Sequence, residues 1–437
     1  MDIVTLIKKI PIHVKYKIGR WTTQYKEYRL IKDVAPLHEQ AIKNLKGKKV
    51  LRCVFFATFD SSWQYDKVYE LLAKHPRFDP IILACPVVNN GRENMIRRMK
   101  DCVDCFTNKG YQVVKAYDEV SDKYVDVRKE LCPDLIFYSS PYEGLVDKKY
   151  YITNYLDILG IYVPYFINSG PSPKFSNDAL LHNLVWRKYA EYDYEKETAI
   201  KEQRVHGRNM VVTGYPEIED LVNPDFEFSL KDWKIKDPSF KRIIWAPHHT
   251  IERTLYAQSC FIPMCDFMVE LARKYQDKVQ FVFKPHPVLY NNLVKLWGRE
   301  KTDEYYAIWR NSPNTACQEG QYAALFHSSD AMIHDCGSFV FEYLFMNKPV
   351  LRTVYTVPLE EMYGKLGLAC LEQHYKASAY NMEEIDNFIK NVIDGVDPLK
   401  EQRAKFVKEV IMPKGQPSQN IVNDILDSID NQIVYRS

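Results

Sequence analysis

The chain has 437 residues, 46% of them hydrophobic, and its 59 basic and 57 acidic side chains give a net charge of +2. This length exceeds one ordinary hydrophobic core, so two domains are expected. The near balance of charge argues against a nucleic-acid-binding protein, which would carry a basic excess.

Residues 1–45 are predicted to form a basic amphipathic segment. Within residues 1–32, eight Lys and Arg residues accompany aromatic and aliphatic side chains, against only two acidic residues. One interpretation is a solvated helix, or a pair of helices, packed on the first domain. The other is a docking segment for the anionic inner face of the cytoplasmic membrane, where each basic residue contributes about 1 kcal/mol. Pro11 interrupts a single long helix.

No pattern typical of a signal peptide or of a bilayer-spanning stretch is found, so we expect a cytoplasmic protein, peripheral on the cytoplasmic membrane. The 10 cysteines are scattered, which is typical of free thiols in a reducing compartment. Cys102 and Cys105 form a lone C-x-x-C without the second ligand pair that a structural zinc site needs.

Strand-like apolar runs alternate with helical patterns along the rest of the chain. The expected strands of the first series lie at 49–58, 80–85, 111–116, 134–139 and 161–166. Helices between them are expected at 63–75, 92–108, 119–131 and 150–159. The expected strands of the second series lie at 209–214, 241–247, 279–285, 330–335 and 349–353. Helices are expected there at 259–276, 290–310, 320–328 and 338–346. This alternation predicts an α/β protein with two Rossmann-like domains facing across a cleft.

The predicted Rossmann-like domains span residues 46–205 and 206–400. Further helices are expected at 382–395, 400–411 and 418–431. The segment 401–437 exceeds what the second sheet needs, so one of its helices can cross back to the first domain.

The stretch "AMIHDCGSFVFEYLFMNKPVL" turns abruptly from a strand into a helix. The strand ends at Asp335, Gly337 allows a ligand to approach the backbone, and Ser338 is a good N-cap. Free N–H groups and the helix dipole favour a phosphate there. Glu342, one turn further on, could accept hydrogen bonds from a ribose diol. The alternative is a plain helix cap with an exposed glutamate.

Two other strands of the second series also end in polar residues. "IIWAPHHTI" places His248 and His249 after a strand, and "FVFKPHPVL" places Lys284 and His286 after the next. Histidine can donate to a phosphate oxygen or move a proton near neutral pH. No carboxylate accompanies either group closely, so no metal site is expected.

The order and spacing of four motifs resemble those of the CDP-glycerol glycerophosphotransferase family. The motifs are "VVTGYPEIEDL", "IIWAPHHTI", "FKPHP" and the turn motif above. This family of teichoic-acid and capsule transferases has the two-domain GT-B fold. The resemblance implies transfer of a polyol phosphate from CDP-glycerol or CDP-ribitol to a glycan or lipid-linked acceptor, with release of CMP. It also implies that no cofactor or active-site metal is required, that residues 46–205 form the acceptor domain and that residues 206–400 form the nucleotide-donor domain.

The resemblance also implies roles for individual residues. His286 matches the histidine that contacts the donor diphosphate, and Glu342 matches an acidic residue for the donor. Ser338, with the backbone of Cys336 and Gly337, matches the phosphate-binding turn. Asp335, His248 and Lys284 are expected beside them at the donor.

Two features depart from the family pattern. Gly337 replaces the first of two paired serines in the turn, and the H-G-T motif that carries the acceptor base is missing. His182 is the only histidine in that part of the first domain and is the candidate base. His248 or His249 could instead approach the acceptor.

Two other functions fit parts of the sequence. The turn is also similar to the "D-S-G-G-x-x-E-E" turn of UDP-N-acetylglucosamine 2-epimerases, although Tyr343 follows Glu342 where a second acid is expected. An epimerase-like enzyme or a nucleotide-sugar glycosyltransferase is therefore one alternative. The other is a non-catalytic glycan-assembly protein, which the missing H-G-T motif would favour.

Overall fold

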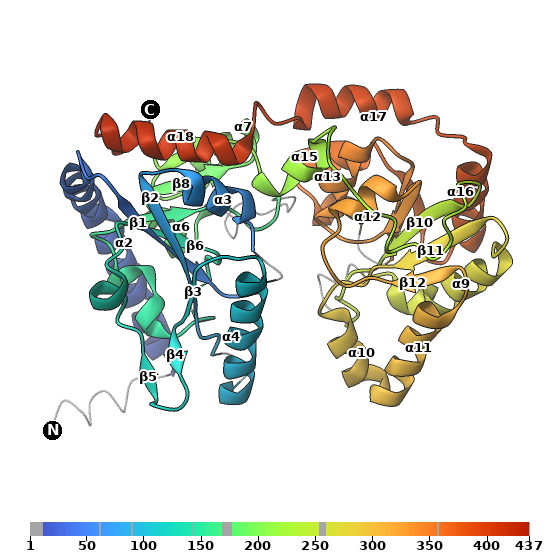
Figure 1. The fold of residues 1–437 in the computed structure, drawn as a ribbon, viewed down its shortest axis with the longest axis horizontal. Coiled ribbons are helices and arrows are strands. Elements are labelled where there is room, and N and C mark those ends of the chain that lie inside the picture. The colour runs from blue at the N-terminus through green and yellow to red at the C-terminus, as the bar shows by residue number, and fades with distance from the viewer. Residues whose placement is uncertain are drawn as a thin grey trace. The chain divides into compact units, whose positions relative to one another are not determined.

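A computed structural model describes residues 12–60, 63–88, 91–142, 144–167, 177–252, 259–355 and 358–436. The chain divides into two units, each built around its own parallel sheet (Figure 1). Unit 1 comprises Met1–Tyr165, Pro173–Pro216 and Pro413–Ser437. Unit 2 comprises Phe166–Ser172 and Glu217–Met412.

In the described part of unit 1, seven parallel strands form a sheet in the order β3-β2-β1-β6-β7-β8-β9. Their bounds are β1 Leu51–Ala57, β2 Phe78–Ala84, β3 Val113–Lys115, β6 Leu135–Tyr138, β7 Leu159–Tyr162, β8 Arg187–Ala190 and β9 Met210–Val212. The helices of this unit are α2 Ile12–Leu45, α3 Asp66–Lys74, α4 Gly91–Asn108, α6 Leu180–Leu184, α7 Asp193–Glu202 and α18 Pro417–Asp430. Shorter elements are the β4–β5 hairpin (Tyr117–Asp118 and Lys123–Tyr124), the π-helix η2 Val127–Leu131 and the 3₁₀ turns η3 Lys148–Tyr150 and η4 Ile152–Asn154.

In the described part of unit 2, six parallel strands follow the order β12-β11-β10-β13-β14-β15. Their bounds are β10 Lys241–Ala246, β11 Val279–Phe283, β12 Thr315–Cys317, β13 Ala331–His334, β14 Val350–Val354 and β15 Tyr375–Ser378. The α-helices are α8 Glu219–Val222, α9 Phe261–Lys274, α10 Leu289–Trp297, α11 Arg299–Asn311, α12 Ala323–Ser328, α13 Phe339–Glu342, α14 Leu359–Met362, α15 Lys365–Leu371, α16 Met382–Asp394 and α17 Lys400–Phe406. The 3₁₀ turns are η5 Pro216–Ile218, which adjoins α8, and η6 Tyr343–Met346, and η7 Val407–Ile411 is a π-helix.

Both sheets are covered by apolar side chains on the strands and helices, as buried parallel sheets require. In unit 1, successive residues of β1 point to opposite faces. Phe55 packs in the core with α3 and α18, and Phe56 packs in the core that contains Ile31 and Val34 of α2. In unit 2, Trp245 of β10 and Phe283 of β11 pack against α9 and α11. The predicted fold class, two Rossmann-like α/β domains, is confirmed.

The order of strands reverses direction at one place in each sheet, between β1 and β6 in unit 1 and between β10 and β13 in unit 2. Ligands of open α/β sheets bind outside the carboxyl ends of the strands at such switch points. In unit 2, the loops after β10 and β13 begin at Pro247 and Asp335. The topology therefore brings the predicted donor residues to the switch point of unit 2.

Several predicted helices have a different structure. The segment 119–131 forms the β4–β5 hairpin and η2, and 150–159 contains two 3₁₀ turns. The predicted helix 290–310 is two helices, α10 and α11. They separate at Gly298, whose φ of 84° is readily adopted only by glycine.

The boundary between the units also differs from the prediction. The strand at Met210–Val212 was expected to open the second series, but it is the last strand of the first sheet. Its neighbour β8 was not predicted at all. Unit 1 therefore extends to Pro216 instead of ending at residue 205.

The C-terminal helix α18 lies over the sheet of unit 1 beside α3 (Figure 1). Its Asp424 carboxylate accepts from Arg187 Nε at 3.0 Å and from the Tyr189 hydroxyl at 2.9 Å, and both partners lie on β8. Ser428 of α18 accepts a further bond from the same guanidinium. A buried ion pair thus attaches α18 to unit 1, whereas α17 and η7 remain in unit 2.

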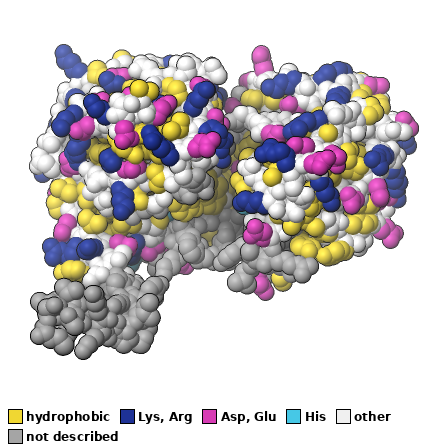
Figure 2. Space-filling view, turned by 90° about the horizontal axis from the view of Figure 1, so that it is seen from below, with side chains coloured by type: hydrophobic (Ala, Val, Ile, Leu, Met, Phe, Trp, Pro, Cys, Tyr) yellow, Lys and Arg dark blue, Asp and Glu magenta, His cyan; other side chains and the backbone are white. Residues whose placement is uncertain are grey.

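Basic and acidic side chains alternate over the face of the molecule that Figure 2 shows, in keeping with the small net charge. Among the helices in the described ranges, none is long and apolar enough to cross a bilayer. The C-x-x-C cysteines lie on α4 as free thiols, and burial raises the pKa of both. Residues 1–11, including Pro11, fall outside the described part of the chain.

Candidate functional site

Three histidines gather where β10 and β11 end in unit 2. The ring centres of His248 and His249 lie 4.3 Å apart, those of His249 and His286 4.3 Å, and those of His248 and His286 5.2 Å. We call these three residues the histidine cluster. The main-chain N–H of His286 donates to Pro247 O at 3.1 Å, and Asn292 Nδ2 of α10 donates to His249 O at 2.9 Å. These bonds connect the two loops that carry the cluster.

The imidazoles of the cluster are held neutral by their surroundings. Burial, together with the neighbouring imidazoles, lowers the pKa of His248 to about 2 and that of His286 to about 4. Burial also lowers the pKa of His249. At neutral pH each ring therefore carries one N–H donor and one lone pair.

Asp335 lies inside the protein, directly after β13, and joins three segments. Its carboxylate accepts the main-chain N–H groups of His248, after β10, and of Cys260, before α9. Burial raises the pKa of Asp335 to about 6, although the Arg352 guanidinium and these two N–H groups favour its ionised form. Asp335 therefore acts on the site through the backbone of His248 instead of facing a ligand.

The turn after Asp335 differs from the predicted N-cap. Ser338 has helical backbone angles, and its side chain makes no capping hydrogen bond. The α-helix that follows is one turn, α13, which continues as the 3₁₀ turn η6. Because so short a helix has a weak dipole, the predicted dipole contribution to phosphate binding is small. Gly337 and Ser338 are half-buried, and Cys336 is buried.

Glu342 is not the exposed side chain that a plain helix cap would have. It is 2% exposed, and the Tyr322 hydroxyl hydrogen-bonds to its carboxylate. Its Oε2 atom has no hydrogen-bond partner within the described chain. Burial raises the pKa of Glu342 to about 7, against the opposing effects of Tyr322 and Lys284. An acceptor oxygen without a donor in the described chain is thus placed one turn after Ser338.

Lys284 is buried beside this carboxylate. Its Nζ donates to Gln318 Oε1 and to Gly320 O, both at 2.8 Å. Burial lowers its pKa to about 8. These bonds fix the ammonium group within unit 2, where its charge favours the ionised form of Glu342.

His182, the predicted acceptor base, lies on α6 inside unit 1. Its ring packs on Tyr162 with the ring centres 5.1 Å apart, and it is 1% exposed. Burial and the nearby Lys188 lower its pKa well below the usual value, against the opposing effect of a hydrogen bond with the main chain of Asn177. His182 therefore has the neutral form of a base, but in this structure solvent does not reach its ring.

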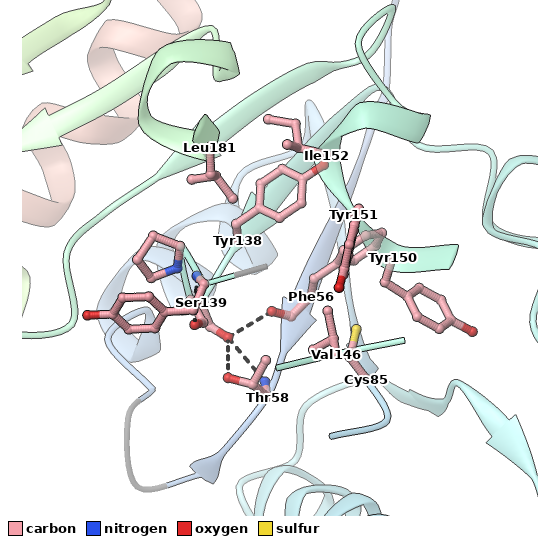
Figure 3. A pocket seen from close by; sticks show the side chains of 13 residues that line it. Phe56, Thr58, Cys85, Tyr138, Ser139, Val146, Tyr150, Tyr151, Ile152 and Leu181 are labelled. Atoms are coloured by element: carbon pink, nitrogen blue, oxygen red, sulfur yellow. Dashed lines mark hydrogen bonds between the residues drawn. The ribbon is translucent and has the colours of Figure 1, made fainter. Parts of the chain in front are cut away.

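Unit 1 has a small pocket at its own switch point, with a volume of about 30 Å³ (Figure 3). At its base, Ser139 Oγ donates to Phe56 O at 2.8 Å and accepts from Thr58 N at 3.1 Å. Tyr138, Tyr150 and further aromatic and aliphatic side chains form the walls. Hydroxyl groups below and aromatic rings around them suit a small hydroxylated group.

Two residues that matter for the site were missed by sequence reasoning. Arg352 of β14 is 1% exposed, and its Nε and Nη1 atoms have no hydrogen-bond partner in the described ranges. Its charge acts on Asp335. Tyr322 supports Glu342. An arginine inside the apolar run "PVLRTV" could have indicated a buried charge near a site, because arginine is almost never fully buried unless it is paired. No comparable sequence signal pointed to Tyr322.

Residues 186–427 match the family described as CDP-Glycerol:Poly(glycerophosphate) glycerophosphotransferase. No curated protein sequence is significantly similar to the chain. A solved structure of a wall teichoic acid polymerase TagF variant soaked with CDPG is similar to it, with a TM-score of 0.55 and 15% identity. That likeness covers 95% of this chain and 99% of the other.

Structures of another enzyme class share the fold. The S. aureus MnaA–UDP structure has a TM-score of 0.55 and 15% identity, over 89% of this chain and 99% of the other. UDP-GlcNAc 2-epimerase from Neisseria meningitidis, bound to UDP-GlcNAc, has a TM-score of 0.53 and 16% identity, over 86% and 99%. At such identities these likenesses establish the GT-B type of fold alone.

Proposed function

Since the chain belongs to the CDP-glycerol:poly(glycerophosphate) glycerophosphotransferase family, we propose that it transfers glycerol phosphate from CDP-glycerol to a hydroxyl group of a glycan or lipid-linked acceptor. The observation that carries the proposal is that the family match at 186–427 spans the polar residues at the switch point of unit 2. CDP-ribitol is the alternative donor, because no described residue distinguishes the two polyols.

In the proposed reaction the acceptor oxygen attacks the phosphorus that carries glycerol. The bond from that phosphorus to the bridging oxygen breaks, and CMP leaves with the electron pair. The acceptor proton passes to a base, for which His249 and His182 are the candidates. Positioning and neutralisation of charge supply most of the rate in phosphoryl transfer.

Each residue of unit 2 has a proposed task. The histidine cluster and the turn at Ser338 hold the donor diphosphate. Glu342 accepts hydrogen bonds from the ribose hydroxyls through the oxygen that has no donor in the described chain. For the acceptor we propose the pocket at Ser139 in unit 1, on the basis of its lining and its place at the switch point.

Calorimetric titration with CDP-glycerol, CDP-ribitol and UDP-N-acetylglucosamine tests this assignment. We expect binding that is selective for cytidine and is lost in Glu342→Ala. Because ionised Glu342 is the better acceptor and its pKa is about 7, affinity should rise as the pH increases through 7. Glu342→Gln should remove this dependence. Selectivity for uridine would instead favour an epimerase or a sugar transferase, and binding of no nucleotide would favour the assembly protein.

We further propose that α2 docks unit 1 on an anionic membrane surface. Trp21, Tyr25 and Tyr28 are 75%, 61% and 60% exposed, and their spacing places them on one side of the helix. Ile31 and Val34, further along, are buried in unit 1. The second half of the helix is thus packed in unit 1, and the first half presents exposed aromatic rings. Trp and Tyr favour the membrane interface.

Basic side chains accompany this aromatic stripe. Lys26, Arg29 and Lys32 are exposed on the same part of α2. Each basic residue close to an anionic surface contributes about 1 kcal/mol. The stripe and its charges therefore fit phospholipid headgroups better than a neutral partner.

Sedimentation of the full chain with vesicles tests the docking. We expect binding to vesicles that contain phosphatidylglycerol, weaker binding to phosphatidylcholine alone, and loss of binding when Trp21, Tyr25 and Tyr28 are all replaced by Ser. Tyr380→Ser, which removes a tyrosine 64% exposed in unit 2, is the matched control. Equal sedimentation of the triple variant and the control would contradict docking through α2.

A further inference from the structure

We propose that His248, His249 and His286 form a site for a divalent transition metal, with Zn²⁺ as its representative. One ring nitrogen from each residue lies within 4.8 Å of the other two. Imidazole nitrogen is a preferred ligand of Zn²⁺, Cu²⁺ and Ni²⁺. The proposal departs from the expectation of a metal-free site. That expectation rested on the absence of a carboxylate close to either motif, but three imidazoles can hold Zn²⁺ without one.

The geometry needs only a small adjustment to hold a metal. Zn–N bonds of about 2.0–2.1 Å in a tetrahedral site place the nitrogens about 3.4 Å apart. Rotation of half-buried side chains can close the remaining distance. The loops themselves are already joined by the bonds from His286 N to Pro247 O and from Asn292 to His249 O. The ligand set is therefore arranged by the backbone before any metal binds.

The hydrogen bonds at Nδ1 of each imidazole influence how readily that ring can bind a metal. His248 Nδ1 lies 2.9 Å from Thr250 Oγ1 and accepts the main-chain N–H of Thr250 at 3.4 Å, which places its ring proton on Nε2. His286 Nδ1 accepts the N–H of Val288 at 3.2 Å in the same way. A metal must displace these bonds or the Nε2 protons, so His248 and His286 are expected to limit the affinity.

The charges around the cluster are compatible with a cation. All three ligands are neutral, for the reasons given above. The buried carboxylate of Asp335 bonds to the main chain of His248 and supplies negative charge nearby. Three histidine ligands leave at least one coordination position open. A diphosphate oxygen of the donor could fill that position. Because a metal-bound His249 has no free lone pair, the acceptor base would then be His182; both consequences rest on the proposed function.

Cobalt titration of the full chain, prepared without an affinity tag and freed of metal by a chelator, tests the proposal. We expect visible absorption from bound Co²⁺ that saturates at one equivalent and disappears when Zn²⁺ is added. His249→Ala and His286→Ala should each abolish it. His206→Asn, which removes an exposed histidine of unit 1 while keeping a residue that tolerates its φ of 53°, should leave it unchanged.

Melting curves and donor titrations complete the test. Zn²⁺ should raise the melting temperature of the wild-type chain and not that of His249→Ala, which separates loss of the site from loss of the fold. Absence of cobalt absorption in protein that still binds CDP-glycerol would overturn the metal site and leave the proposed function standing. Cobalt binding without CDP-glycerol binding would support the site and reject the function. Absorption that survives in both histidine variants would also overturn it.

Discussion

Replacement of His286 by alanine is expected to lower the turnover of CDP-glycerol by about 10²–10³-fold, the usual loss when one group that stabilises developing charge is removed. The ring of His286 is half-buried in the histidine cluster, at the switch point where the donor diphosphate is proposed to bind. Its main-chain bond to Pro247 O does not depend on the side chain. The fold should therefore persist in the variant.

His286→Asn is the matched variant for this experiment. Asn Oδ1 can accept the Val288 N–H as His286 Nδ1 does, but the side chain has no equivalent of Nε2. CMP release should fall as far in His286→Asn as in His286→Ala if Nε2 is the working atom. A folded His286→Ala protein that releases CMP at a near-normal rate would contradict the assignment. Recovery in His286→Asn would show that His286 only shapes its loop.

The central strands of both sheets could be predicted because their signal is local. β1, β10, β11 and β13 are apolar runs, and most end at a proline or a polar residue. Buried parallel strands have this composition wherever they occur. The order of the two series then leads to the fold class, since helical crossovers between parallel strands are right-handed. The candidate donor residues followed from the ends of the same strands.

Strand β8 could not be predicted, because its stability depends on a distant segment. Arg187 and Lys188 are its first two residues and are fully buried, which contradicts the usual pattern for these residues. The partner of Arg187 is Asp424 on α18, 237 residues further along the chain. The sequence "RKYA" has no apolar pattern that would predict a buried strand, and its local sequence does not reveal the ion pair that allows its burial. The missed strand also displaced the predicted domain boundary.

Prediction of the candidate site was also limited by contacts between segments that are distant in the sequence. The sequence places His248, His249 and His286 at two neighbouring strand ends, but the distances between their rings follow only from the pairing of β10 with β11. Glu342 was found by its spacing from Ser338, but its burial and its bond to Tyr322 depend on how α12 packs against α13 and η6. Local patterns locate residues at a strand end, whereas protonation and access depend on contacts between elements.

Replacement of Asp335 by asparagine is expected to weaken CDP-glycerol binding by about 10–100-fold, the equivalent of one hydrogen bond to a charged acceptor at about 1.5–3 kcal/mol. The ionised carboxylate accepts two N–H groups, from His248 and Cys260. An asparagine amide has one acceptor oxygen and presents donors to the second N–H. The main chain of His248 then loses its fixed position.

The pH dependence separates this positioning role from a role in the fold. With a pKa raised to about 6, Asp335 is ionised above pH 6, so donor binding by the wild-type chain should weaken as the pH falls through 6. Asp335→Asn resembles the protonated form, so its weaker binding should lack this dependence. Calorimetry between pH 5 and 8, with Glu342 unchanged in both proteins, measures the difference.

The expected effect on stability has the opposite sign. Because the folded pKa of Asp335 lies above its usual value of 3.8, its contribution to the free energy of unfolding is fully present below pH 3.8 and is lost as the pH rises through 6. At pH 8 the variant escapes the cost of burying this charge, so its melting temperature should stay within a few degrees of the wild type. A large fall in melting temperature together with lost binding would instead show that Asp335 holds the core of unit 2.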